Sequence, residues 1–146
     1  MPTVRDPRYP GLRSVVQSHA AMRGVSIEVG VQGGEVAEYA AFNEYGTQTI
    51  PPRPFMRTSL KRNRRRWSNL FAMAMSATTR RDDAGAIRAL HFTGTTAVAD
   101  TQETLRKGPW IPNADSTIAR KGSSRPLVDT GQLVQSIRYR LTRVPG

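Results

Sequence analysis

The triplet Asp129-Thr-Gly131 is the part of the sequence whose residue types come closest to known catalytic chemistry. In aspartic proteases, two such carboxylates from two lobes or two subunits share one proton. A protease of this kind also needs a β-rich segment after the triplet, and only residues 132–146 follow it here. Helix capping explains the same residues, because Asp129 followed by Gln132 three positions later forms the capping-box pattern. We therefore interpret Asp129 and Gln132 as a helix cap.

Other catalytic and metal-binding patterns are weak. His19 and His91 are the two histidines, and neither has another histidine or a carboxylate three or four residues further on. The sequence contains no cysteine, which excludes thiol nucleophiles, disulfides and cysteine-based metal sites. Neither a Gly-x-Ser-x-Gly turn nor a glycine-rich phosphate loop occurs. We expect a protein that is not an enzyme and has no catalytic residues, metal site or cofactor.

The charges give a stronger signal. The chain of 146 residues has 22 Lys and Arg against 11 Asp and Glu, a formal net charge of +11. No acidic residue lies between Tyr45 and Arg81, a stretch with nine basic residues. Six of them form what we call the basic face: Arg57, Lys61, Arg62, Arg64, Arg65 and Arg66. Like charges this close repel one another on a helix, and an anionic partner would relieve the repulsion. Three interpretations stay open: a solvated helix face, an acidic protein partner, or nucleic acid contacted through its phosphates.

Apolar spacing predicts the elements that position these residues. Alternation over Val25–Val31 predicts a strand, and Glu35–Tyr45 a short helix that stops at Gly46. A long helix is expected over about 54–79, with Pro54 at its first position. Its apolar stripe is Met56, Leu60, Asn63, Trp67, Leu70, Ala74 and Ala77.

A second long helix is predicted to start at Asp82-Asp83, where acidic side chains meet the positive end of the helix dipole, and to end at Gly108-Pro109. Its stripe is Ile87, Leu90, Gly94, Ala97 or Val98, Thr101 and Leu105. A long loop over 108–128 leads to a short helix ending at Ser136. Ile137, Tyr139 and Leu141 then alternate with polar residues as a final strand.

These elements predict an α+β fold in which a small antiparallel sheet packs against two longer helices, with one long extended loop. Residues 1–24 are expected to form an extended or partly disordered arm, and 25–146 a single domain. No apolar run reaches the length of a membrane span, and the N-terminus lacks the apolar core of a signal peptide. We expect synthesis in the cytoplasm and no membrane partner.

Two segments resemble the tail-completion, or head–tail joining, proteins of tailed bacteriophages, a family also labelled minor tail or virion-morphogenesis proteins. The first segment, residues 41–57, contains Glu44-Tyr-Gly-Thr47 and Pro52-Arg-Pro-Phe-Met56. The second, residues 121–139, contains Pro126-Leu-Val-Asp-Thr-Gly-Gln-Leu-Val-Gln-Ser-Ile137. Both segments match motifs of that family in the same order, and the likeness covers roughly residues 25–143.

The resemblance implies a structural protein of the virion neck that forms a homo-oligomeric ring. Its partners would be the head connector or stopper, the tail terminator or tail tube proteins, and the passing DNA genome. The proline-rich strap over 47–54 is stiff, and we expect it to present its side chains outward as a subunit or partner contact: Thr47, Ile50, Pro52, Arg53 and Pro54. Phe55 and Met56 would anchor in the core, leaving Arg53 to pair with a carboxylate.

Two other functions remain possible on the sequence alone. One is a tail terminator, a ring that caps the tail tube. The other is a small basic protein that binds DNA without regard to sequence, using the helix that contains the basic face.

Overall fold

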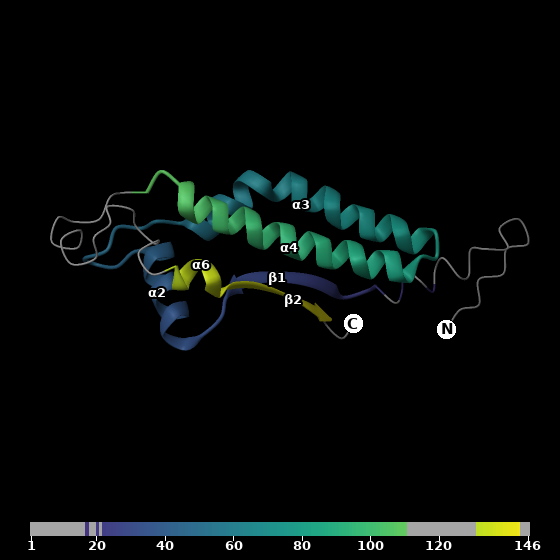
Figure 1. The fold of residues 1–146 in the computed structure, drawn as a ribbon, viewed down its shortest axis with the longest axis horizontal. Coiled ribbons are helices and arrows are strands. Elements are labelled where there is room, and N and C mark those ends of the chain that lie inside the picture. The colour runs from purple at the N-terminus through teal and green to yellow at the C-terminus, as the bar shows by residue number, and fades with distance from the viewer. Residues whose placement is uncertain (1–16, 18–19, 21, 111–130, 144–146) are drawn as a thin grey trace, which may run out of the picture. The chain divides into compact units, whose positions relative to one another are not determined.

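The computed structural model describes residues 17, 20, 22–110 and 131–143 (Figure 1). Their elements are, in chain order, β1 (Val25–Val31), α2 (Gly34–Tyr45), α3 (Phe55–Thr79), α4 (Asp83–Lys107), α6 (Gln132–Ser136) and β2 (Ile137–Arg143). The α+β class is confirmed, and every predicted helix and strand in this part of the chain is present. Most of the predicted arm over 1–24 and most of the loop over 108–128 lie outside the described residues.

The two strands form one antiparallel sheet. Its register is visible in two cross-strand pairs. The hydroxyls of Ser26 and Thr142 lie 2.6 Å apart, and Arg140 Nε donates to Glu28 Oε2 at 2.6 Å. In β2, Ile137 is buried while Arg138 and Arg140 are exposed, which is the alternation expected of a strand with one covered face.

The chain divides into two compact units. Of the described residues, the first unit contains 17, 20, 22–28, 65–95 and 140–143, and the second contains 29–64, 96–110 and 131–139. The expectation of a single domain over 25–146 stays a prediction.

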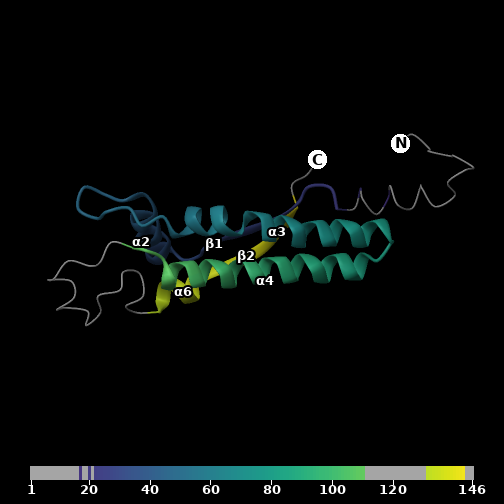
Figure 2. The same ribbon diagram turned by 90° about the horizontal axis from the view of Figure 1, so that it is seen from above.

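The first unit is built on a helical hairpin, in which the end of α3 turns back into the start of α4 (Figure 2). Asp82 lies just before α4, where its Oδ1 accepts from Gly85 N at 2.8 Å and its carbonyl from Ala86 N at 2.9 Å. The predicted acidic start of this helix is therefore confirmed. The buried side chains are small or medium-sized: Ala74, Ala77, Thr78, Ala86, Leu90 and Thr93.

The second unit contains the main apolar cluster. Its buried members come from four helices and one strand: Ala40, Phe55, Leu105, Leu133, Val134 and Ile137. Trp110 packs against them and donates its indole N–H to the carbonyl of Leu105 at 2.9 Å. Helix α2 contacts α6 in this unit (Figure 1), and Gln102 on α4 donates to the carbonyl of Val134 at 3.0 Å.

Two positions of the predicted apolar stripes are wrong. Leu60 is 51% exposed and Ile87 is 50% exposed. On α3, burial of Phe55 at the first residue brings Ser59, four positions on, to the buried side. Ser59 is accommodated there because its hydroxyl lies 3.1 Å from that of Thr101 on α4. On α4, Ala86 takes the buried place expected for Ile87.

Candidate functional site

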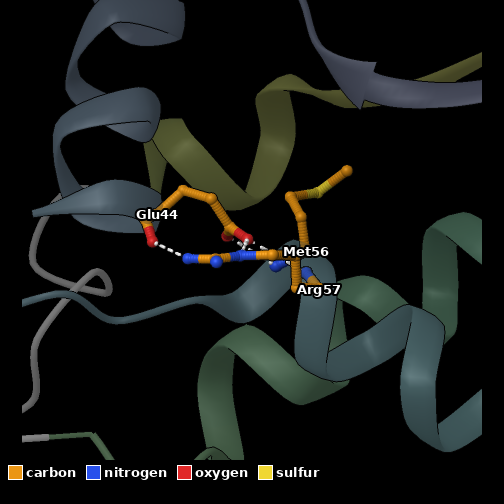
Figure 3. Close-up of polar contacts among 3 residues, drawn as sticks. All are labelled: Glu44, Met56 and Arg57. Atoms are coloured by element: carbon orange, nitrogen blue, oxygen red, sulfur yellow. Dashed lines mark hydrogen bonds and ion pairs between the residues drawn. The ribbon is translucent and has the colours of Figure 1, made fainter.

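The glutamate of the first motif, Glu44, caps the start of α3 (Figure 3). Its Oε2 accepts from Met56 N at 2.9 Å, and its Oε1 accepts from Arg57 N at 3.1 Å. The first amides of a helix have no partner within the helix, and Pro54, just before α3, has no side-chain acceptor to offer them. The carboxylate is supplied by the last turn of α2 instead. Glu44 is thereby linked to the end of the Pro52-Arg-Pro-Phe-Met56 step, 12 residues further along the chain.

Arg57 is held by the same glutamate (Figure 3). Its Nε donates to Glu44 Oε1 at 2.9 Å, and its Nη2 donates to the Glu44 carbonyl oxygen at 2.6 Å. The guanidinium also lies over the ring of Tyr45, 5.1 Å from the centroid, a distance at which cation–π attraction operates. Arg57 is therefore held in one orientation, with its charge paired to that of Glu44.

Arg53 is buried, with 7% of its surface exposed. Its Nη1 donates to Asn43 Oδ1 at 3.2 Å, and its backbone N–H donates to the Asn43 carbonyl at 2.6 Å. Burial lowers the pKa of the guanidinium from its usual value, and Tyr39 acts in the opposite direction. The sequence expectation that Arg53 points outward is wrong, because its side chain is buried. The arginine that pairs with the Glu44 carboxylate is Arg57. We call Asn43, Glu44, Arg53, Met56 and Arg57 the capping network.

The segment between α2 and α3 starts with a self-bonded turn. Thr47 N donates to the Ile50 carbonyl at 2.9 Å, and Thr47 Oγ1 accepts from Ile50 N at 3.0 Å. Gly46, with φ 78°, leads into it, and a Cβ at this position would lie 3.0 Å from Pro52 Cδ. Only glycine fits both the positive φ and this close approach.

Four of the five predicted strap contacts keep some exposure. Thr47 and Pro52 are exposed, and Ile50 and Pro54 are half-buried. Gln48 and Thr49 at the tip of the turn are exposed as well. Because the turn is held by its own hydrogen bonds, it presents these side chains at small entropic cost to a partner.

The remaining basic face is exposed along α3: Lys61, Arg62, Arg64, Arg65 and Arg66. The structure places the first three in the second unit and the last two in the first. Within the described part of the chain, Lys61, Arg62 and Arg64 form no ion pair. Each like-charged pair three or four residues apart destabilises a helix by about 0.2–0.5 kcal/mol. The charges of these side chains therefore do not stabilise α3.

A small cleft lies on the flank of α3 in the second unit. It has a volume of about 200 Å³ and is lined by Arg62, Asn63, Asp100, Glu103, Thr104 and Lys107. Within this lining, Lys107 Nζ and Glu103 Oε1 form an ion pair at 2.8 Å, one turn apart on α4. Carboxylates as well as cations line this cleft, so it is not a cradle for an anion.

The predicted cap of the last helix is placed differently. Helix α6 begins at Gln132, and the residue before it, Gly131 with φ 66°, has no side chain to cap this end. Gln132 is thus the first helical residue and not the third, so the expected capping-box position for it is wrong. Asp129 lies outside the described residues.

The described residues give no further site of the usual kinds. Among them, no three His, Cys, Asp or Glu side chains gather as metal ligands would. None of their helices is both long enough and apolar enough to span a membrane. Comparisons with protein-family models, curated proteins and solved structures find no match to this chain.

Sequence reasoning missed the role of Asn43 and Glu44. The available signal was their position in a mostly apolar helical turn directly before the glycine stop of α2. Buried polar side chains in such a place need partners, and the nearest unsatisfied donors are the first amides of the next helix.

Proposed function

We propose that this chain is a structural protein of the neck of a tailed bacteriophage, where it completes the proximal end of the tail and joins it to the head as a ring subunit. The role is structural and not enzymatic, and its place is the virion. Besides further copies of itself, the partners we propose are the connector or stopper on the head side and the terminator or tube proteins on the tail side.

The observation that supports this proposal most is that residues of the two motif segments pack together in the second unit. Glu44, Met56 and Arg57 of the first segment form the capping network. Leu133 and Ile137 of the second segment pack in the same apolar cluster as Phe55. The residues that carry the family likeness thus support one another in the second unit, as expected if the likeness reflects a shared fold.

The exposed turn at 47–52 supplies a surface for the ring contact. It is ordered by its own hydrogen bonds, and the adjacent Tyr45 is 72% exposed. Aromatic side chains with this exposure are enriched at protein interfaces.

Electron microscopy of lysates from a phage lacking the gene tests the proposal. Full heads beside separate tails of normal length would support it. Abnormally long tails would instead indicate a tail terminator, and intact infectious particles would exclude both neck roles.

Point variants in the same phage test the turn. Gln48→Trp places a bulky side chain on the exposed tip without touching the core, whereas Ala99→Trp does the same on an exposed position of α4. We expect unjoined tails with the first variant and normal particles with the second. Normal particles with both variants would show that the turn is not part of the interface.

A further inference from the structure

We propose that Lys61, Arg62 and Arg64 of α3, which we call the α3 patch, bind the phosphate backbone of double-stranded DNA without reading its sequence. This inference rests on the proposed neck role and deepens it by naming the partner of one surface.

The α3 patch has a charge that the described part of its own chain does not neutralise. All three side chains are exposed. Two carboxylates of the second unit are engaged with other cations, since Glu44 holds Arg57 and Glu103 holds Lys107. Asp100 lines the small cleft beside Arg62 but forms no ion pair with it. Lys61 and Arg64 are three residues apart and face the same side of α3, while Arg62 lies on the flank next to the small cleft.

A second copy of this chain is a poor partner for the α3 patch. Each copy has a formal net charge of +11, so a ring of copies accumulates positive charge instead of balancing it. The partner must therefore be a polyanion of another kind.

Duplex DNA fits this surface better than an acidic protein does. Protein interfaces have an apolar centre, whereas Leu60 is the one large apolar side chain exposed between 55 and 64. Arginine guanidinium groups match the oxygens of a phosphate by paired hydrogen bonds. A duplex also presents its charges at a dense, regular spacing along its whole length.

The neighbouring side chains leave nothing to read the bases. Asn63, the residue type that recognises adenine, is half-buried and donates its amide to the Ser59 carbonyl at 3.0 Å. Between 58 and 64 no aromatic residue is present for stacking on single-stranded bases. Contacts are therefore to phosphates of a duplex, and affinity is expected to be independent of sequence.

The test is a titration of the full chain with a mixed-sequence DNA duplex, followed by fluorescence anisotropy at several salt concentrations. The patch variant has Lys61→Gln, Arg62→Gln and Arg64→Gln. Each lost phosphate contact reduces the slope of log K against log salt by about 0.9, so the three together reduce it by about 2.7. Between about 50 and 200 mM salt, affinity of the unmodified chain should then fall roughly fortyfold more than that of the variant.

A matched variant controls for net charge. Arg88→Gln, Arg106→Gln and Arg138→Gln remove three exposed arginines elsewhere, and we expect this variant to keep nearly the full slope. Equal losses in the two variants would show that overall charge, and not the α3 patch, binds DNA. Binding of polyglutamate as tight as that of DNA would equally overturn the inference, in favour of an acidic protein partner.

Folding of the patch variant is checked by its melting temperature, which we expect to be unchanged or higher, because the removed charges repel one another. The outcomes also separate this inference from the neck role. Unjoined tails in the deletion phage without DNA binding would leave the neck role and remove the α3 patch as a DNA site. DNA binding by the α3 patch together with intact, infectious deletion particles would support the DNA site and exclude the neck role.

Discussion

The carboxylate of Glu44 performs two tasks at once, because it accepts from two backbone amides of α3 and from the side chain of Arg57. Only 7% of the Glu44 side chain is exposed, against 59% for Arg57. The ion pair is therefore partly screened by water, and the bonds to the helix amides account for most of the stabilisation.

We expect Glu44→Gln to lower the free energy of unfolding by about 1–2 kcal/mol, because an amide keeps one acceptor oxygen but turns its NH₂ group toward a second donor. Chemical denaturation measures this loss. Glu38→Gln, an exposed change on the same helix, is the control and should change stability by less than about 0.5 kcal/mol. Equal effects of the two changes would contradict the capping role.

Arg53→Ala is expected to destabilise the folded chain by about 2 kcal/mol, because it removes a charged donor from Asn43 and leaves a void where the buried side chain packs. Thermal unfolding of the purified protein measures the effect. Arg106→Ala, at an exposed position, is the matched control. A melting temperature unchanged by Arg53→Ala would show that Arg53 does not stabilise the folded chain, and would favour a contact made only on assembly.

Which of the two arginines would meet the carboxylate could not be predicted from the sequence. Arg53 and Arg57 flank the same helix start, and both are able to reach a nearby acid. The choice depends on the direction in which α2 delivers Glu44, toward the amides of Met56 and Arg57. That direction is a property of the tertiary fold and leaves no periodic signal.

At the scale of the elements, α3 and α4 are long, periodic and bounded by proline, aspartate and glycine, and the sequence predicts their limits within about one residue. Strand alternation predicted β1 and β2 in the same way. The buried side of α3 was misplaced near its start because Leu60 is apolar and Ser59 is polar. Ser59 is buried there with its hydroxyl against that of Thr101, and a pattern of apolar residues does not reveal such a contact.

The helical hairpin of the first unit depends on small side chains. Ala86 is fully buried, so Ala86→Leu would force extra volume into a packed site and should destabilise by about 1–3 kcal/mol. Ala84→Leu adds the same volume at an exposed position of the same helix and should have little effect. Urea denaturation of both variants measures the difference; comparable stability of the two would show that the hairpin is loosely packed.

For the molecule as a whole, the excess of positive charge has opposite effects on its two proposed kinds of partner. Like-charged copies repel, and added salt screens that repulsion beyond a Debye length of about 10 Å at 0.1 M. We therefore expect self-association of the purified chain to strengthen with salt, while DNA binding weakens. Sedimentation velocity at low and high salt measures the first effect. Association that weakens with salt would mean that copies meet through ion pairs, against the argument for a polyanionic partner.

The capping network also bears on the order in which the chain folds. Glu44 and the amide of Met56 are 12 residues apart in sequence, and loops of about this length close in roughly 10–100 ns. Bringing Phe55 against Leu105 or Ile137 of the apolar cluster requires the closure of much longer loops, at a larger entropic cost. We therefore expect the corner between α2 and α3 to be formed in the folding transition state, so that Glu44→Gln slows folding while truncation of Ile137 mainly speeds unfolding. A newly made chain would then have its basic helix anchored at one end before the C-terminal strand arrives to complete the core.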